Sequence, residues 1–164
     1  EDQVPPLIRK ITGVYEENIV VSPCEAVWTD GSFANNYNFQ TEMLEGNGEY
    51  FTGGSLYGGT WDDKGMLTCT DGWCLVKNKI GLTTGTYKGA FKDNLPHGKG
   101  TFKWEDTGEK YTGNFWEGKR HTRPEDEDAK QEYKDHEDTL RIFKGRFDMG
   151  KRGQPSAIDG IKVE

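Results

Sequence analysis

The sequence is poor in the residues from which large aliphatic cores and disulfide frameworks are built. Hydrophobic residues make up 32% of the chain, and there are three cysteines, Cys24, Cys69 and Cys74. Three irregularly spaced cysteines are too few for a disulfide framework, and no Cys-x-x-Cys or nearby His pair completes a zinc site. We therefore expect no bound metal and reduced thiols in an intracellular compartment. A Cys69–Cys74 pair across a turn at Asp71-Gly72 is the open alternative.

Long apolar runs and a positive charge surplus are also missing. No run approaches the roughly 20 apolar residues that span a bilayer, so we expect a soluble or peripheral membrane protein. The net charge is −7, and acids gather at Glu16-Glu17 and over residues 125–138. A chain of this charge is not attracted to phosphate backbones, so we expect no nucleic-acid partner. Because the sequence begins with Glu1, we expect a fragment or a mature protein that reached an organelle after losing a targeting peptide.

Glycine and aromatic residues are abundant instead, and they form a repeat. Glycine accounts for 22 of 164 residues, about twice the usual share. The pattern Tyr-x-Gly-x-Phe-x-x-Asn/Gly-x-x-His runs almost twice, and such self-similarity outranks other sequence signals. The fuller copy comprises Tyr87, Gly89, Phe91, Asn94, His97, Gly98 and Gly100. The second comprises Tyr111, Gly113, Phe115, Gly118 and His121, and then breaks at Thr122 and Pro124.

Each copy has the pattern of a β-hairpin. Around Tyr87, aromatic residues and glycine alternate with polar residues at period 2, which is typical of a strand with one buried face. Asn94 and the Pro96-His97-Gly98 segment predict the turn. Alternation resumes from Gly100, which predicts the return strand. Glycine on the aromatic side would let neighbouring rings lie over the backbone.

These residues resemble the MORN repeat (membrane occupation and recognition nexus), whose motif is Tyr-x-Gly-x-Phe/Trp-x-x-Gly-x-x-His-Gly-x-Gly. Poorer copies flank the strong ones over about residues 30–153. One begins with Tyr57, Gly59 and Trp61, and another contains Phe143, Gly145, Phe147, Gly150 and Gly153. An upstream copy with an implied start at Asn35 includes Asp30-Gly31, Phe39, Gly46, Gly48 and Gly53-Gly54. The resemblance implies an all-β fold: an elongated, twisted antiparallel meander of β-hairpin repeats, used for protein or membrane contacts and not for catalysis.

The ends and one insertion interrupt the repeats. We expect an extended N-terminal arm over residues 1–29 with a first strand at 11–21, the repeat sheet over 30–153, and a C-terminal tail over 154–164. The acidic insertion at 125–138 is rich in helix formers, which predicts a short exposed helix. A disordered loop is its alternative.

Nothing in the sequence singles out catalytic or cofactor-binding residues. His97 and His121 occupy the turn of the repeat, at the same register, without a partner residue recurring beside them. No nucleophile elbow and no phosphate-binding glycine loop is found. We therefore expect no enzyme activity and no cofactor.

We predict a non-catalytic scaffold, an accessory subunit of a larger, membrane-bound organellar assembly, that contacts other protein subunits through its sheet face and terminal arms. A rival is a peripheral module that binds anionic lipid at a membrane surface. Its contacts would be Lys88, Lys92, Lys99, Lys103 and Lys110. A third alternative is the regulatory repeat region of an enzyme.

Overall fold

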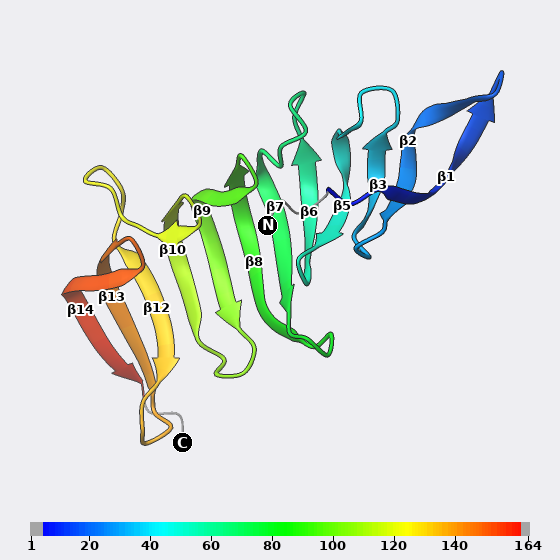
Figure 1. Ribbon diagram of the computed structural model, residues 1–164. Helices are drawn as coiled ribbons and strands as arrows, with labels where there is room; N and C mark the ends of the chain where they lie inside the picture. Colours follow the sequence, from blue (N-terminus) through cyan, green and yellow to red (C-terminus); the bar gives the residue numbers. More distant parts are fainter. Residues whose placement is uncertain (1–4, 162–164) are drawn as a thin grey trace.

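The computed structural model describes residues 5–161, the last eight of them (154–161) by their backbone alone. Within this range the chain forms one open antiparallel sheet and no helix, so the predicted all-β meander is confirmed (Figure 1). No helix in the described range could cross a membrane.

Successive strands are neighbours across the sheet. Two short strands are exceptions to this order: β4 pairs only with β3, and β11 pairs only with β10. The strands are β1 (Ile8–Glu16), β2 (Ile19–Trp28), β3 (Phe33–Asn38), β4 (Met43–Leu44), β5 (Gly46–Thr52), β6 (Ser55–Trp61), β7 (Cys69–Lys77), β8 (Thr83–Lys92), β9 (Leu95–Trp104), β10 (Lys110–Trp116), β11 (Lys119–Arg120), β12 (Ala129–Lys134), β13 (Leu140–Asp148) and β14 (Lys151–Ile161).

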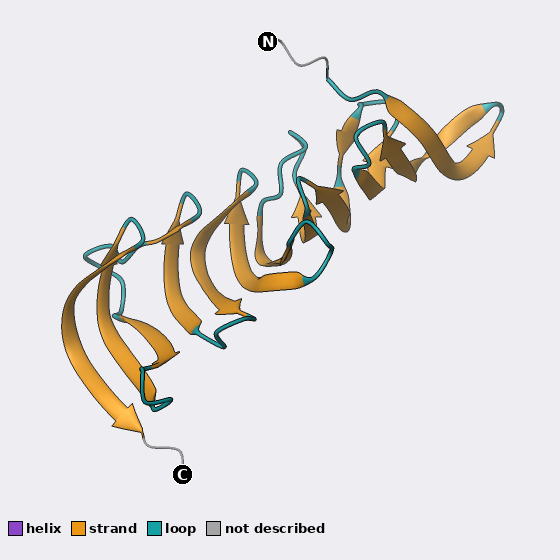
Figure 2. Ribbon diagram, turned by 60° about the horizontal axis from the view of Figure 1, so that its bottom comes forward, coloured by secondary structure: helices purple, strands orange, loops and turns teal. Residues whose placement is uncertain are grey.

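The sheet is a single curved layer with turns along its two long edges (Figure 2). Most domains bury apolar surface between two layers, whereas here the core is formed by rings packed on one face of the sheet. The larger cluster contains Trp61, Leu67, Cys74, Tyr87, Phe91, Tyr111, Phe115, Ala129, Phe143 and Phe147. A smaller one near the N-terminus contains Val20, Cys24, Ala26 and Tyr37.

A row of small residues crosses the sheet beneath these rings. Consecutive members face each other in register or approach within a Cβ contact, from β5 to β13. The row consists of Gly48, Gly59, Gly72, Gly89, Gly100, Gly113, Ala129 and Gly145. A Cβ added at Gly113 would lie 2.6 Å from Tyr111 Oη. Glycine therefore leaves the space that the rings occupy.

Tight turns close the three hairpins whose first strands are β8, β10 and β13. Both central residues of each turn have positive φ, which is the geometry of a type I′ turn. The turns are Asp93-Asn94, Glu117-Gly118 and Met149-Gly150. The sequence placed the turn of the β8–β9 hairpin too far along the chain. Asn94 belongs to the turn, but Pro96, His97 and Gly98 lie within β9.

The N-terminal segment contains two strands where the sequence predicted one over residues 11–21. Glu17 and Asn18 both have positive φ and form a turn between β1 and β2. At the other end, the expected tail continues β14 as far as Ile161, paired with β13. The terminal segments thus supply the two edge strands of the sheet.

The insertion at 125–138 is neither helical nor disordered as predicted, because its centre forms strand β12. The side chains of Ala129 and Gln131 are buried. Strand β12 pairs with β10 on one side and with β13 on the other. Two ladders of backbone hydrogen bonds and a buried face override the helix propensity of this segment.

One further expectation is corrected in the N-terminal half. Asn35 and Asn36 both lie beside Gly48 in the row of small residues, as expected of the upstream copy, but the turn predicted at Asp71-Gly72 is absent. Asp71-Gly72 is in the middle of β7 and makes no turn, so Cys69 and Cys74 lie along one strand. All three cysteines are free, and burial raises the pKa of the Cys74 thiol to about 11.

The ring-over-glycine packing predicts a specific destabilisation. Gly113→Val should lower the free energy of unfolding by at least about 1–3 kcal/mol, because the added methyl groups overlap Tyr111 and Ala129. Thr112→Val, one residue away and on the opposite face, is the control and should change it by less than about 0.5 kcal/mol. Urea unfolding measures both, and equal stabilities for the two variants would contradict this packing.

Candidate functional site

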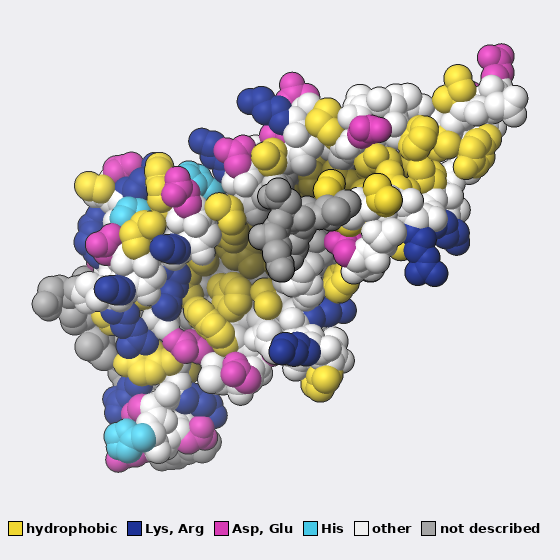
Figure 3. Space-filling model, viewed as in Figure 1, with side chains coloured by type: hydrophobic (Ala, Val, Ile, Leu, Met, Phe, Trp, Pro, Cys, Tyr) yellow, Lys and Arg dark blue, Asp and Glu magenta, His cyan; other side chains and the backbone are white. Residues whose placement is uncertain are grey.

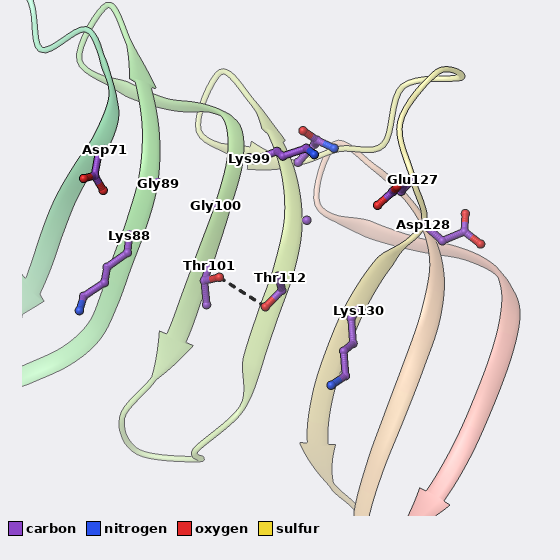
Figure 4. A pocket seen from close by; sticks show the side chains of 12 residues that line it. Asp71, Lys88, Gly89, Lys99, Gly100, Thr101, Thr112, Glu127, Asp128 and Lys130 are labelled. Carbon is purple, nitrogen blue, oxygen red and sulfur yellow. Dashed lines mark hydrogen bonds between the residues drawn. The ribbon is translucent and has the colours of Figure 1, made fainter.

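The two faces of the sheet differ in chemistry. Side chains alternate along each strand, so the residues of the larger cluster share one face, which we call the aromatic face. Figure 3 shows hydrophobic side chains gathered over the middle of the side seen in Figure 1. The opposite, polar face carries lysines and threonines (Figure 4).

Six rings form a continuous chain across the aromatic face. Each ring meets the next edge to face, at centroid distances of 5.0 to 5.5 Å. This is the geometry that aromatic pairs prefer. In order, the rings are Phe91, Tyr87, Phe115, Tyr111, Phe147 and Phe143. Because Tyr87 on β8 reaches Phe115 on β10, the chain passes over β9 and locks successive hairpins together.

The tyrosines of this chain bury their hydroxyl groups with a partner. Tyr87 Oη donates to the Ala90 carbonyl and Tyr111 Oη to the Asn114 carbonyl, each at 2.7 Å and three residues further along the chain. Burial raises the pKa of both hydroxyls above the ordinary value of 10.0. The repeat thus satisfies its one buried polar group by a local hydrogen bond.

The structure brings the residues predicted as the repeat core together on the aromatic face, except for His97 on β9, whose ring lies 4.5 Å from that of Trp116. Tyr57 is half-buried and Trp61 is buried on β6, where they occupy the positions of Tyr87 and Phe91. Gly59 and Gly89 share a φ of 152°, a value that favours glycine. The remaining members are Gly98, Gly100, Tyr111, Gly113, Phe115, Phe143, Gly145 and Phe147.

A recurring partner for the two histidines was missed in the sequence. His97 Nδ1 accepts the Glu117 backbone N–H, and His121 Nδ1 accepts that of Met149, both at 3.4 Å. The donor is the first turn residue of the following hairpin in each case. Thr68 has the same role in the preceding hairpin, because its hydroxyl accepts the Asp93 N–H at 3.2 Å. These side chains connect one turn to the next, which is a structural function.

Several rings on the aromatic face remain half-exposed, and between them lies a hollow of about 200 Å³. The hollow is lined chiefly by Leu44, Tyr50, Tyr57, Trp61 and Leu67. The other half-buried rings of this face are Phe102, Trp104 and Tyr133. This arrangement can accept apolar groups from another molecule.

Two arginines on the aromatic face were also missed. Arg120 lies over the rings of Trp104, Tyr111 and Phe147 at 5.1 to 5.7 Å from their centroids. Arg152 lies 4.4 Å from the Tyr133 centroid. Such cation–π contacts place positive charge beside the rings. Only the spatial proximity of distant strands reveals them, since neither arginine belongs to the repeat motif.

The polar face has a shallow groove of about 540 Å³ over β8, β9, β10 and β12. Figure 4 shows Lys88 and Lys130 flanking Thr101 and Thr112, whose hydroxyls are 3.4 Å apart. Three lysines line the groove (Lys88, Lys99 and Lys130), and so do three acids (Asp71, Glu127 and Asp128). By strand alternation, Lys92, Lys103 and Lys110 share this face. Lys103 is paired with Glu105 at 2.9 Å.

The buried tyrosines predict how stability depends on pH. A hydroxyl whose pKa is raised in the folded state contributes stability below pH 10.0, and that contribution is lost as the pH rises further. We expect alkaline unfolding, with part of the tyrosinate absorbance at about 295 nm appearing only as the circular dichroism signal is lost. If every tyrosine ionised near pH 10.0 in a folded sheet, burial of these hydroxyls would be disproved.

The turn-to-turn contacts predict a small stability effect with a matched rescue. His97→Leu removes the acceptor for the Glu117 N–H and should lower the free energy of unfolding by about 0.5–1.5 kcal/mol. Thr68→Val should have a similar effect, because it removes the equivalent acceptor. His97→Asn supplies a carbonyl oxygen and should recover part of the loss. Thermal unfolding measures the series, and a His97→Asn variant no better than His97→Leu would argue against this role.

Comparison with known proteins supports the repeat assignment. No curated protein matches the chain. The family model of the MORN repeat matches residues 87–109 and 111–121, which cover most of the β8–β9 hairpin and the β10–β11 turn. MORN repeats as a kind are non-catalytic and serve contacts with proteins and membranes. The matched residues, the ring chain and the type I′ turns together show that residues 87–121 of this protein form MORN repeats.

Proposed function

We propose that this protein is a non-catalytic scaffold, an accessory subunit of a larger assembly, whose aromatic face is covered by other protein subunits. The single observation that carries the proposal is a one-layer sheet with half-exposed rings. Tyr50, Tyr57, Phe102, Trp104 and Tyr133 pack against the core yet retain accessible surface.

The aromatic face has the composition of a protein-binding surface. Interface centres are enriched in Tyr, Trp, Phe and Arg and depleted of Lys and Glu. Here the rings are accompanied by Arg120 and Arg152, and the lysines of the strongest repeats lie on the opposite side. The hollow beside Trp61 would receive an apolar side chain of the partner, and the guanidinium groups would receive its carboxylates.

The cellular setting is part of the same proposal. The three cysteines are free and two of them are buried, which suits a reducing, intracellular compartment. We propose that the assembly is bound to an organellar membrane, and fractionation of source cells with an antibody against this protein tests that location.

The lipid-binding rival has one point in its favour and one against it. Its five lysines, Lys88, Lys92, Lys99, Lys103 and Lys110, share the polar face, as a membrane-binding surface requires. Asp71, Glu127 and Asp128 line the same groove, however, and balance the three lysines there. Attraction of polybasic surfaces to anionic lipid depends on uncompensated positive charge, so we favour protein partners.

The proposal is tested by a pair of variants on opposite faces. Tyr50→Ser with Trp104→Ser removes two half-exposed rings and should reduce recovery of co-purifying subunits from source cells by tenfold or more, because aromatic residues dominate binding energy. Lys88→Ser with Thr112→Ser changes the polar face and should leave recovery unchanged. Circular dichroism and thermal unfolding confirm that both proteins are folded.

Two results would contradict the proposal. In the first, the aromatic-face variant recovers the same subunits as the native protein. In the second, the native protein floats with anionic vesicles, its binding falls as salt rises, and replacing the five lysines abolishes it. The second result would assign the protein to membranes.

A further inference from the structure

The outer edge of strand β1 is open. In the described part of the chain β1 pairs only with β2, so one row of its backbone N–H and C=O groups has no strand beside it. Proteins usually shield such an edge, because it is a template for another strand. Here it also carries exposed apolar side chains, since Val14 is 66% and Tyr15 60% accessible.

The charges of β1 are arranged with opposite signs at its two ends. Arg9 and Lys10 lie near its start, whereas Glu16 ends it and Glu17 follows. All four side chains are exposed. When two identical strands pair antiparallel, the start of one lies beside the end of the other. The edge is therefore complementary in charge to a second copy of itself.

The faces of β1 fix the register of such a pair. Ile11 faces buried Ala26, Tyr15 faces buried Val20, and a Cβ at Gly13 would lie 2.9 Å from Cys24 Cβ. These three residues thus share the side of the N-terminal core cluster. By alternation, Lys10, Thr12, Val14 and Glu16 share the other side.

A two-fold axis perpendicular to the sheet keeps each face continuous, and directly opposed residues of an antiparallel pair share a face. With the axis at Gly13, Ile11 lies opposite Tyr15 of the second copy and Thr12 opposite its Val14. Lys10 then lies opposite Glu16 of the second copy, on the same face. A single register therefore satisfies the charges, the apolar contacts and the face assignment.

We propose that this protein forms a symmetric dimer in which β1 pairs antiparallel with β1 of a second copy about Gly13, so that the two sheets become one. The register shift opposite Gly13 favours this arrangement, because its extra residues belong to β2 and leave β1 regular from Lys10 to Glu16. The dimer is independent of the proposed function, since it uses an edge of the sheet and leaves the aromatic face free.

The opposite edge of the sheet is less suited to strand pairing. Strand β14 contains Pro155, which has no N–H to donate and is typical of protected edges. Pairing of β1 with β14 would also be head-to-tail, which leads to rings or filaments and not to a closed dimer. The β1 edge therefore has a second β1 as its best partner.

A charge exchange tests the proposal on the full chain. Sedimentation velocity from about 1 to 100 µM should show a monomer that converts to a dimer. Lys10→Glu and Glu16→Lys should each raise the dissociation constant about tenfold or more, because each places like charges opposite one another at two symmetric sites. The double variant restores both pairs and should dimerise like the native protein. Lys144→Glu is the control, because it makes the same charge change at an exposed side chain on β13, far from the β1 edge.

Hydrogen exchange gives a second, mutation-independent measurement. Backbone amides within residues 10–16 should become protected as protein concentration rises, while those of the turn at residues 78–82 should not change. Three results would overturn the proposal: a native protein that stays monomeric throughout, a double variant that dimerises no better than either single variant, or oligomers that grow beyond the dimer.

Discussion

The packing of tyrosine and phenylalanine rings over glycine is the interaction on which this sheet depends. A single layer has no second layer to bury its apolar side, so its rings must find contact within their own face. Edge-to-face pairs supply that contact, and each contributes about 0.5–1.5 kcal/mol beyond the area it buries. The rings can lie flat across neighbouring strands only because the row from Gly48 to Gly145 holds no larger side chain than the methyl of Ala129.

The single layer nevertheless has two faces and two edges of distinct chemistry. One face is apolar enough to hold the strands together, and its outermost rings stay accessible. The other face is polar and carries balanced charges around its groove. The edges differ as well, because β1 presents complementary charges and exposed apolar side chains, whereas β14 contains a proline. The two faces and the two edges of the sheet therefore differ in chemistry.

Much of the architecture could be predicted from local sequence. The alternation around Tyr87 and the copies at Tyr111, Tyr57 and Phe143 indicated the hairpins, because period 2 and turn residues act over a few positions. Prediction failed where long-range contacts decide. Residues 125–138 favour a helix locally, but Ala129 fits between Gly113 and Gly145 and makes the segment a strand.

The sequence alone determined the repeat and the position of its buried rings, because Tyr-x-Gly-x-Phe requires a ring, a space beside it and a second ring on one face of one strand. Only the tertiary structure decided how the copies connect. That Thr68 takes the role of His97, that Arg120 lies over three rings, and that the turn at Met149 donates to His121 all depend on which strands become neighbours. Such contacts join residues about 20 to 30 positions apart, and no local pattern records them.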